Sequence, residues 1–393
     1  MSTLARTDKS LFGRWWWTVD RWMLAALIAI AAIGALLTLA ASPAVAERIG
    51  LDSYHFVRRQ FVFLPVSLVI MVVVSLMTPR GIRRLAVACA AFALLGMLAT
   101  LVVGVEIKGA TRWVHLAGLS LQPSEFLKPA FAVIAAWLFA ESSTNASLPG
   151  NKLATGLFIV IAILLLLQPD VGMTAVVAAI WGVEFFLAGL PLVLVGMIAA
   201  LFMGGIVGAY FTFSHVQGRI DRFLDPSSGE GYQVMRALEA FRSGGLFGRG
   251  PGEGRVKEVL PDAHADFIFA VAGEEFGLIA CLVLLALFAF VVLRGFSRVL
   301  REDNLFILLA VAGLLVQFGL QVIINIASTL NMIPPKGMTL PFVSYGGSST
   351  LALAIGMGMM LALTRERPGL GASRKAGGPG KFMAVSPLGG GAL

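Results

Sequence analysis

The sequence predicts an all-α polytopic membrane protein with about ten transmembrane helices. Of its 393 residues, 58% are hydrophobic and 13% are charged, and the mean hydropathy is +0.87. Its apolar runs reach the length that a helix needs to cross a bilayer. The short alternating strands of a membrane-spanning β-barrel are not found in the sequence. Together these observations favour a bundle of hydrophobic helices.

The predicted spans follow from the apolar runs, taken in chain order. The first run, Met23–Ala41, is too long for the apolar part of a signal peptide, so we interpret it as an uncleaved anchor despite the cleavage-like Ala44-Val45-Ala46. Trp15, Trp16, Trp17 and Trp22 fit an interfacial aromatic belt before it. The predicted spans are 22–42, 60–78, 85–105, 124–140, 153–168, 171–188, 191–213, 267–294, 304–331 and 346–364.

An even number of spans places both termini on one side of the membrane. Cations in the short loops of that side indicate that it is cytoplasmic, and they explain the net charge of +8 without a nucleic-acid partner. We therefore expect a cytoplasmic segment at 1–21, a transmembrane domain at 22–366 and a disordered basic tail at 367–393. The two cysteines, Cys89 and Cys281, lie in apolar runs and predict no disulfide.

The largest loop, residues 214–265, is then expected on the outer side. Tyr232–Phe241 has helical apolar spacing. The run from Gly244 to Gly254 contains no P-loop, since GxxxxGK[ST] cannot be fitted to it. Two interpretations of the glycine run stay open, a backbone nest for a phosphate and a flexible turn.

The segment Glu106–Lys128 is a second outer region with candidate binding residues. Lys108 and Arg112 have the charge to hold an anionic head group, although ordinary snorkelling cations would look the same. Trp113 is suited to the membrane interface. Glu125 and Lys128 fall inside a span, where charges need partners, and an i,i+3 pair between them is the simplest account.

Other polar residues interrupt the apolar runs. Asp170 is a predicted N-cap, and Glu184 needs a polar partner that the sequence does not identify. Gln317, Gln321 and Asn325 share one helix face, where hydrogen bonds to a neighbouring helix are favoured over a polar cavity. Three prolines and two glycine groups in 333–349 predict broken backbone near the membrane surface.

The stretch Leu260–Ala270, LPDAHADFIFA, places two aspartates beside an apolar run. Sequence alone favours Asp266 as the N-cap of the next helix. The alternative is a carboxylate at the membrane surface that takes a proton from a lipid-linked substrate.

Four motifs in this order resemble one family. They are GATRWVHLAGLSLQPSEFLK, LLLLQPDVG, GEGYQVMRALEAFRSGGLFGRGPGEGRVKEVLPDAHADFIFAVAGEEFG and IPPKGMTLPFVSYGGSS. The chain is similar over residues 20–366 to the SEDS family (shape, elongation, division and sporulation). The Pro-Lys-Gly element at Lys336 resembles the cell-division branch more than the elongation branch. The resemblance implies ten transmembrane helices with a large extracytoplasmic loop between the seventh and eighth.

The resemblance also implies an activity, the polymerisation of lipid II into glycan strands with undecaprenyl diphosphate as leaving group. The family's essential loop aspartate aligns with Asp266, the expected general base, and Ala265 replaces the family's usual Thr. Glu258 is the expected secondary acid. Candidates to bind the diphosphate are Lys336, Arg112, Lys108 and Arg255, and further expected site residues are Trp113, Gln122, Ser124, Glu125, His264 and Ser344.

No cofactor is certain from the sequence, and a divalent cation (Mg²⁺ or Mn²⁺) held by Asp266 and Glu258 is left open. The expected partners are lipid II, a class B penicillin-binding protein and other division proteins, in the bacterial cytoplasmic membrane at the septum. A lipid II flippase and a non-catalytic scaffold are the alternative functions.

Overall fold

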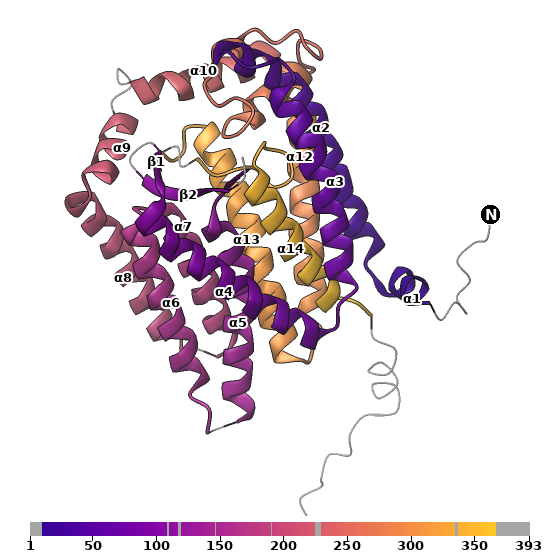
Figure 1. The fold of residues 1–393 in the computed structure, drawn as a ribbon, viewed down its shortest axis with the longest axis vertical. Helices are drawn as coiled ribbons and strands as arrows, with labels where there is room; N and C mark the ends of the chain where they lie inside the picture. Colours follow the sequence, from indigo (N-terminus) through magenta and orange to yellow (C-terminus); the bar gives the residue numbers. More distant parts are fainter. Residues whose placement is uncertain are drawn as a thin grey trace, which may run out of the picture.

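The chain folds into a bundle of long helices, seen in a computed structural model that describes residues 10–107, 110–116, 119–145, 147–189, 191–224, 229–334 and 337–366. The predicted all-α class is confirmed, and Figure 1 shows the bundle with helices α9 and α10 at one end. The elements are α1 (Leu11–Thr18), α2 (Arg21–Arg48), α3 (His55–Ser75), α4 (Pro79–Val103), β1 (Val105–Ile107), β2 (Ala110–Leu116), β3 (Leu119–Leu121), α5 (Pro123–Thr144), α6 (Gly150–Leu167), α7 (Val171–Leu187), α8 (Leu192–Thr212), α9 (Ser214–Leu224), α10 (Gly229–Gly244), α11 (Val256–Val259), α12 (Ile268–Val299), α13 (Leu305–Thr329) and α14 (Gly347–Leu363).

Each of the ten predicted spans corresponds to one helix, α2 to α8 and α12 to α14. Within the described residues, seven of these helices are long and apolar enough to cross a membrane, and α7 and α14 are shorter apolar helices. The chain is therefore a multi-pass membrane protein. Helices α5 and α13 lie at the centre, since most of their residues are buried, and they pack against each other and against α7 and α14.

The two described ends of the chain meet at one end of the bundle, here called the terminal face. Arg365 donates from Nε to the Thr18 hydroxyl at 3.0 Å, and the Glu366 N–H donates to the Thr18 carbonyl at 3.0 Å. At the same face Asp20 accepts from Arg294 and Arg298, each at 2.7 Å. Helix α1 and the last turn of α14 thus lie at the same end of the bundle (Figure 1), and the prediction that both termini are cytoplasmic stays a prediction. The tail expected at 367–393 lies outside the described residues.

Two details at the ends of the bundle differ from the sequence-based expectation. Trp15, expected in an interfacial belt, is buried within the protein, and its Nε1 donates to the Ser75 hydroxyl at 2.8 Å. Strands β1, β2 and β3 form a small antiparallel sheet in the order β1-β2-β3, which was not predicted from the sequence. Its strands have three to seven residues, and such short strands leave little periodic signal.

The opposite end of the bundle, here called the loop face, carries α9, α10, α11 and the strands. The helix expected at 232–241 is present as α10, which packs on the first part of α12. Helix α12 is interrupted at Gly277, which has φ 77° and ψ −177°. Residues of α12 before the interruption lie against the loop, and residues after it continue through the bundle.

Candidate functional site

The candidate site is built around Asp266, which lies at the loop face one residue before the cap of α12. The N-cap of α12 is Phe267 and no side chain caps the helix, so the expectation that Asp266 caps it is wrong. The Asp266 side chain is half-buried. A Cβ placed on Gly337 would lie 3.5 Å from Asp266 Oδ2. The carboxylate therefore lies beside Gly337 of the broken segment 333–349. Gly337 is the residue that follows Lys336 in the sequence.

The backbone around Asp266 is held by residues from α13 and from the segment before α14. Asn325 donates from Nδ2 to the Asp266 carbonyl at 3.0 Å and to the Met338 carbonyl at 2.7 Å. The Ser344 hydroxyl donates to the Ala265 carbonyl at 2.5 Å. These part-buried bonds join chain segments far apart in sequence and hold the turn of Asp266 in one place.

His264 is a further support of the same turn. Its backbone carbonyl accepts from the Tyr345 N–H at 2.9 Å, and its ring stacks on Phe56 with centroids 4.3 Å apart. Burial lowers the pKa of His264 to about 4, while Asp262 raises it and Arg48 lowers it further. The imidazole is thus neutral at neutral pH, and its aromatic face is used for packing. A cavity of about 620 Å³ opens here, lined in part by Arg48, Phe56, Asp262 and His264.

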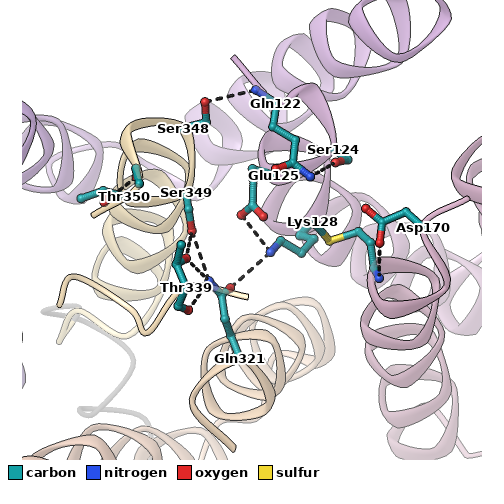
Figure 2. A network of polar contacts seen from close by, with 12 residues as sticks. Gln122, Ser124, Glu125, Lys128, Asp170, Gln321, Thr339, Ser348, Ser349 and Thr350 are labelled. Atoms are coloured by element: carbon teal, nitrogen blue, oxygen red, sulfur yellow. Dashed lines mark hydrogen bonds and ion pairs between the residues drawn. The ribbon is translucent and has the colours of Figure 1, made fainter. Parts of the chain in front are cut away.

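A network of buried polar side chains lies under the site, between α5, α13 and α14 (Figure 2). Lys128 is 1% exposed; its Nζ lies 2.9 Å from Glu125 Oε2 and donates to Gln321 Oε1 at 3.2 Å. Gln321 donates in turn to Thr339 and Ser349. The predicted Glu125–Lys128 pair is therefore present, and it belongs to a larger network that sequence reasoning missed.

The same network extends to the small sheet. The Gln122 N–H donates to Ser348 Oγ at 3.1 Å, and its side chain donates to Ser124 at 3.2 Å. Ser348 donates to the Ser120 carbonyl at 3.2 Å. In the sequence, the placement of Gln317, Gln321 and Asn325 on one helix face was the feature that indicated a polar interior. Gln321 bonds to α5, to α14 and to the broken segment, as the favoured helix-to-helix bonding predicts. Asn325 bonds to the turn before α12 and to the broken segment.

One of the predicted anion-binding residues, Arg112, has contacts within the protein. Arg112 donates from Nε to the Gln168 carbonyl at 3.3 Å and also to Pro169, and it lies 3.4 Å from Asp170. Asp170 accepts from the Met173 N–H at 3.1 Å, so its predicted N-cap is confirmed. Arg112 thus fastens a turn between two spans, and its role toward a diphosphate stays a prediction.

The remaining predicted residues are dispersed. Glu258 and Arg255 are exposed, within and just before α11, and Trp113 is half-buried in β2. Lys108 and Lys336 lie outside the residues that the structure describes. Among the described residues, no three or more His, Cys, Asp or Glu side chains come together as metal ligands. The Asp266 and Glu258 pair therefore stays an untested option for a cation.

The glycine run has a structural role that differs from both open interpretations. The N–H groups of Arg249 and Gly250 donate to the carbonyls of Glu274 and Glu275 at 2.9 and 3.0 Å. A Cβ on Gly248 would lie 2.2 Å from the Glu275 carbonyl oxygen. The run therefore docks against the interruption in α12 and satisfies backbone groups that the broken helix leaves open. These two N–H groups are not available as a phosphate nest.

Fold and site define a polytopic helical membrane protein with an acidic residue held at one end of a polar interior. The family model described as "Cell cycle protein", which covers FtsW, RodA and SpoVE, matches residues 20–368. The chain belongs to this SEDS family and is of the FtsW type.

Several relatives and solved structures agree with this assignment. A probable peptidoglycan glycosyltransferase FtsW of Caulobacter vibrioides is 48% identical over 375 residues, covering 95% of this chain and 96% of the relative. The corresponding protein of Escherichia coli O6:H1 is 32% identical, covering 88% and 86%. A chain in a solved peptidoglycan synthase complex matches with a TM-score of 0.72 and 28% identity, covering 88% of this chain and 97% of that one. Thermus thermophilus RodA matches at 0.63 and 28%, covering 89% and 97%.

Proposed function

We propose that the chain is a peptidoglycan glycosyltransferase that polymerises lipid II into glycan strands during septal wall synthesis and releases undecaprenyl diphosphate. The observation that carries the proposal is the position of Asp266. Its carboxylate lies beside Gly337, and its backbone is held by Asn325. The names of the relatives, which are probable peptidoglycan glycosyltransferases, support the same reaction.

In the proposed reaction Asp266 accepts the proton of the attacking sugar hydroxyl. The hydroxyl oxygen forms a bond to the anomeric carbon of the second lipid II, and the bond from that carbon to the diphosphate oxygen breaks. A carboxylate base contributes about 10²–10⁴-fold to such a step. The diphosphate leaves as an anion when cations neutralise it, so no second acid is required. Lys336, next to Gly337, is the first candidate for this role, before Arg112, Lys108 and Arg255.

The proposed setting is the bacterial cytoplasmic membrane at the septum, with both termini cytoplasmic and the loop face outward. A class B penicillin-binding protein is the proposed partner, since a structural neighbour belongs to a complex that coordinates polymerisation with crosslinking. The flippase alternative has one specific observation in its favour. Glu184 is fully buried in α7, and neither of its carboxylate oxygens has a hydrogen-bond partner among the described residues.

The test is lipid II polymerisation by the purified full-length chain with its penicillin-binding partner. Asp266→Asn is expected to lower the rate by about 10²–10⁴-fold. The control is Asp52→Asn, an exposed aspartate in the turn between α2 and α3. Full activity of Asp266→Asn would refute the proposed base. Lipid II translocation by a chain that forms no polymer would favour the flippase.

A further inference from the structure

Helix α11 is the element that leads into the Asp266 turn, and it is too short to be stable by itself. It has four residues, Val256–Val259, and one intrahelical turn does not offset the entropy of ordering it. Its first N–H groups and last carbonyls have no partners within the helix. Side chains from two membrane-spanning helices bind these groups, one at each end.

The first end is bound by Glu274 of α12. Glu274 Oε1 accepts from the N–H groups of Arg255 and Val256, each at 2.8 Å, and Oε2 accepts from the Lys257 N–H at 3.0 Å. Glu274 is fully buried, so these bonds are the compensation for its charge. The neighbouring Glu275 forms a buried ion pair with Lys257, which ties α11 to α12 a second time.

The second end is bound by Arg48, the last residue of α2. Its two terminal nitrogens donate to the carbonyls of Glu258 and Leu260, at 3.2 and 3.1 Å. A guanidinium reaches two acceptors at once because its donors form a planar fork, whereas a lysine ammonium is a single point charge. The anion thus lies at the N–H end of α11 and the cation at its carbonyl end, as the direction of the peptide dipoles requires.

The far end of the same segment is held independently. His264, Ala265 and Asp266 are bonded through their carbonyls to the chain near α14 and to Asn325. The turn that carries Asp266 is therefore fixed at one side by these bonds and at the other side by Arg48 and Glu274. Loss of the Arg48 or the Glu274 side chain is expected to loosen residues 255–260, which lead to Asp266. Neither change replaces the Asp266 carboxylate.

We propose that Arg48 and Glu274 are positioning residues for the transfer site, which hold α11 by its two ends and so set the place of the Asp266 carboxylate. The proposal rests on the proposed polymerase function. It also gives α2 a direct link to the site, because a movement of Arg48 relative to α12 displaces α11. A small displacement of a catalytic group costs up to about 10²-fold in rate.

The experiment uses the full-length chain with its penicillin-binding partner and compares Arg48→Lys and Arg48→Met with Arg59→Lys. Arg59 is exposed at the same face on α3, so it is the matched arginine control. Both Arg48 variants are expected to lower kcat by about 10–100-fold with KM and melting temperature unchanged. Glu274→Gln is expected to lower kcat likewise, and Glu274→Asp, which keeps the charge, is expected to restore part of it.

Amide hydrogen exchange of the same proteins provides a readout that does not depend on activity. Faster exchange at 255–260 is expected in the Arg48 and Glu274 variants and not in Arg59→Lys. Unchanged exchange there, or Arg48→Lys with the kcat of the control, would overturn the positioning role. A wild-type protein that forms no polymer while its 255–260 amides are protected would overturn the polymerase function and leave the binding of α11 intact.

Discussion

Asn325 and Asp266 are joined by a hydrogen bond in which the Asn325 side-chain amide donates to the Asp266 backbone carbonyl at 3.0 Å. The same nitrogen donates to the Met338 carbonyl at 2.7 Å. One amide on the central helix α13 therefore binds two neighbouring segments, the turn that carries the candidate base Asp266 and the broken segment at Met338. The relative position of these two segments, and of any substrate between them, depends on this amide.

Asn325→Leu is expected to lower lipid II polymerisation about tenfold, since it leaves two part-buried carbonyls without this donor, at about 1–3 kcal/mol each. Gln317→Leu is the control on the same helix face, because Gln317 Oε1 has no hydrogen-bond partner among the described residues. Steady-state rates of the two variants measure the difference. Equal losses in both would show that the Asn325 bridge has no special role.

Lys128→Met is expected to destabilise the protein by about 3–5 kcal/mol, because it leaves the buried Glu125 carboxylate without its cation. Replacing both, as Lys128→Met with Glu125→Gln, is expected to cost less than the single change. Denaturant unfolding in detergent followed by tryptophan fluorescence measures both values. A double variant no more stable than Lys128→Met would contradict this account of the network.

Gly248→Ala is expected to disturb the docking of the loop on α12 and to reduce activity. The new Cβ would lie 2.2 Å from the Glu275 carbonyl oxygen. Gly252→Ala is the control: its φ of +85° is close to the +80° of Gly248, but nothing lies within 4 Å of its Cβ. Both share a backbone strain of about 1–2 kcal/mol, so the excess loss in Gly248→Ala reports the contact. Thermal unfolding and polymerisation are the measurements.

Acidification is expected to destabilise the wild-type protein through His264. Its pKa falls from 6.5 to about 4 on folding, because burial disfavours the imidazolium. Between these values the unfolded chain binds the proton and the folded chain does not, so stability falls as the pH drops from 6.5 to about 4. The loss of stability due to His264 is complete below a pH of about 4 and absent above pH 6.5.

His264→Phe removes this titration and keeps a ring against Phe56. Its melting temperature is expected to decline less than that of wild type over the same pH interval. His55→Phe on α3 is a control for the loss of a histidine at the same face. If the melting temperatures of wild type and His264→Phe declined equally between pH 6.5 and about 4, His264 would not be the cause of the acid destabilisation.

The spans could be predicted from the sequence because hydropathy is a property of neighbouring residues. A run such as 304–331 is apolar whatever it packs against, and α13 occupies Leu305–Thr329. The N-cap at Asp170 was predictable for the same reason, since a cap bonds to a residue three positions later. The loop helix α10 followed from its local periodicity.

The partners of the polar residues were not predictable in this way. Asp266 has the local sequence of a cap, yet the helix begins after Phe267 and the carboxylate lies beside Gly337. Arg112 has the charge of an anion-binding residue, and its bond to the Gln168 carbonyl was not foreseen from the sequence. Each outcome depends on what another part of the chain brings within hydrogen-bonding distance.

By itself the sequence determined that this chain crosses a membrane repeatedly and that its acids and amides must find partners, because hydrophobic burial and the cost of unpaired polar groups act at every residue. Only the tertiary structure decided which partners they find. Gln122 and Ser348 are 226 positions apart, and Arg48 and Leu260 are 212 apart. Such pairs form through the packing of whole helices, and no local pattern in the chain carries that information.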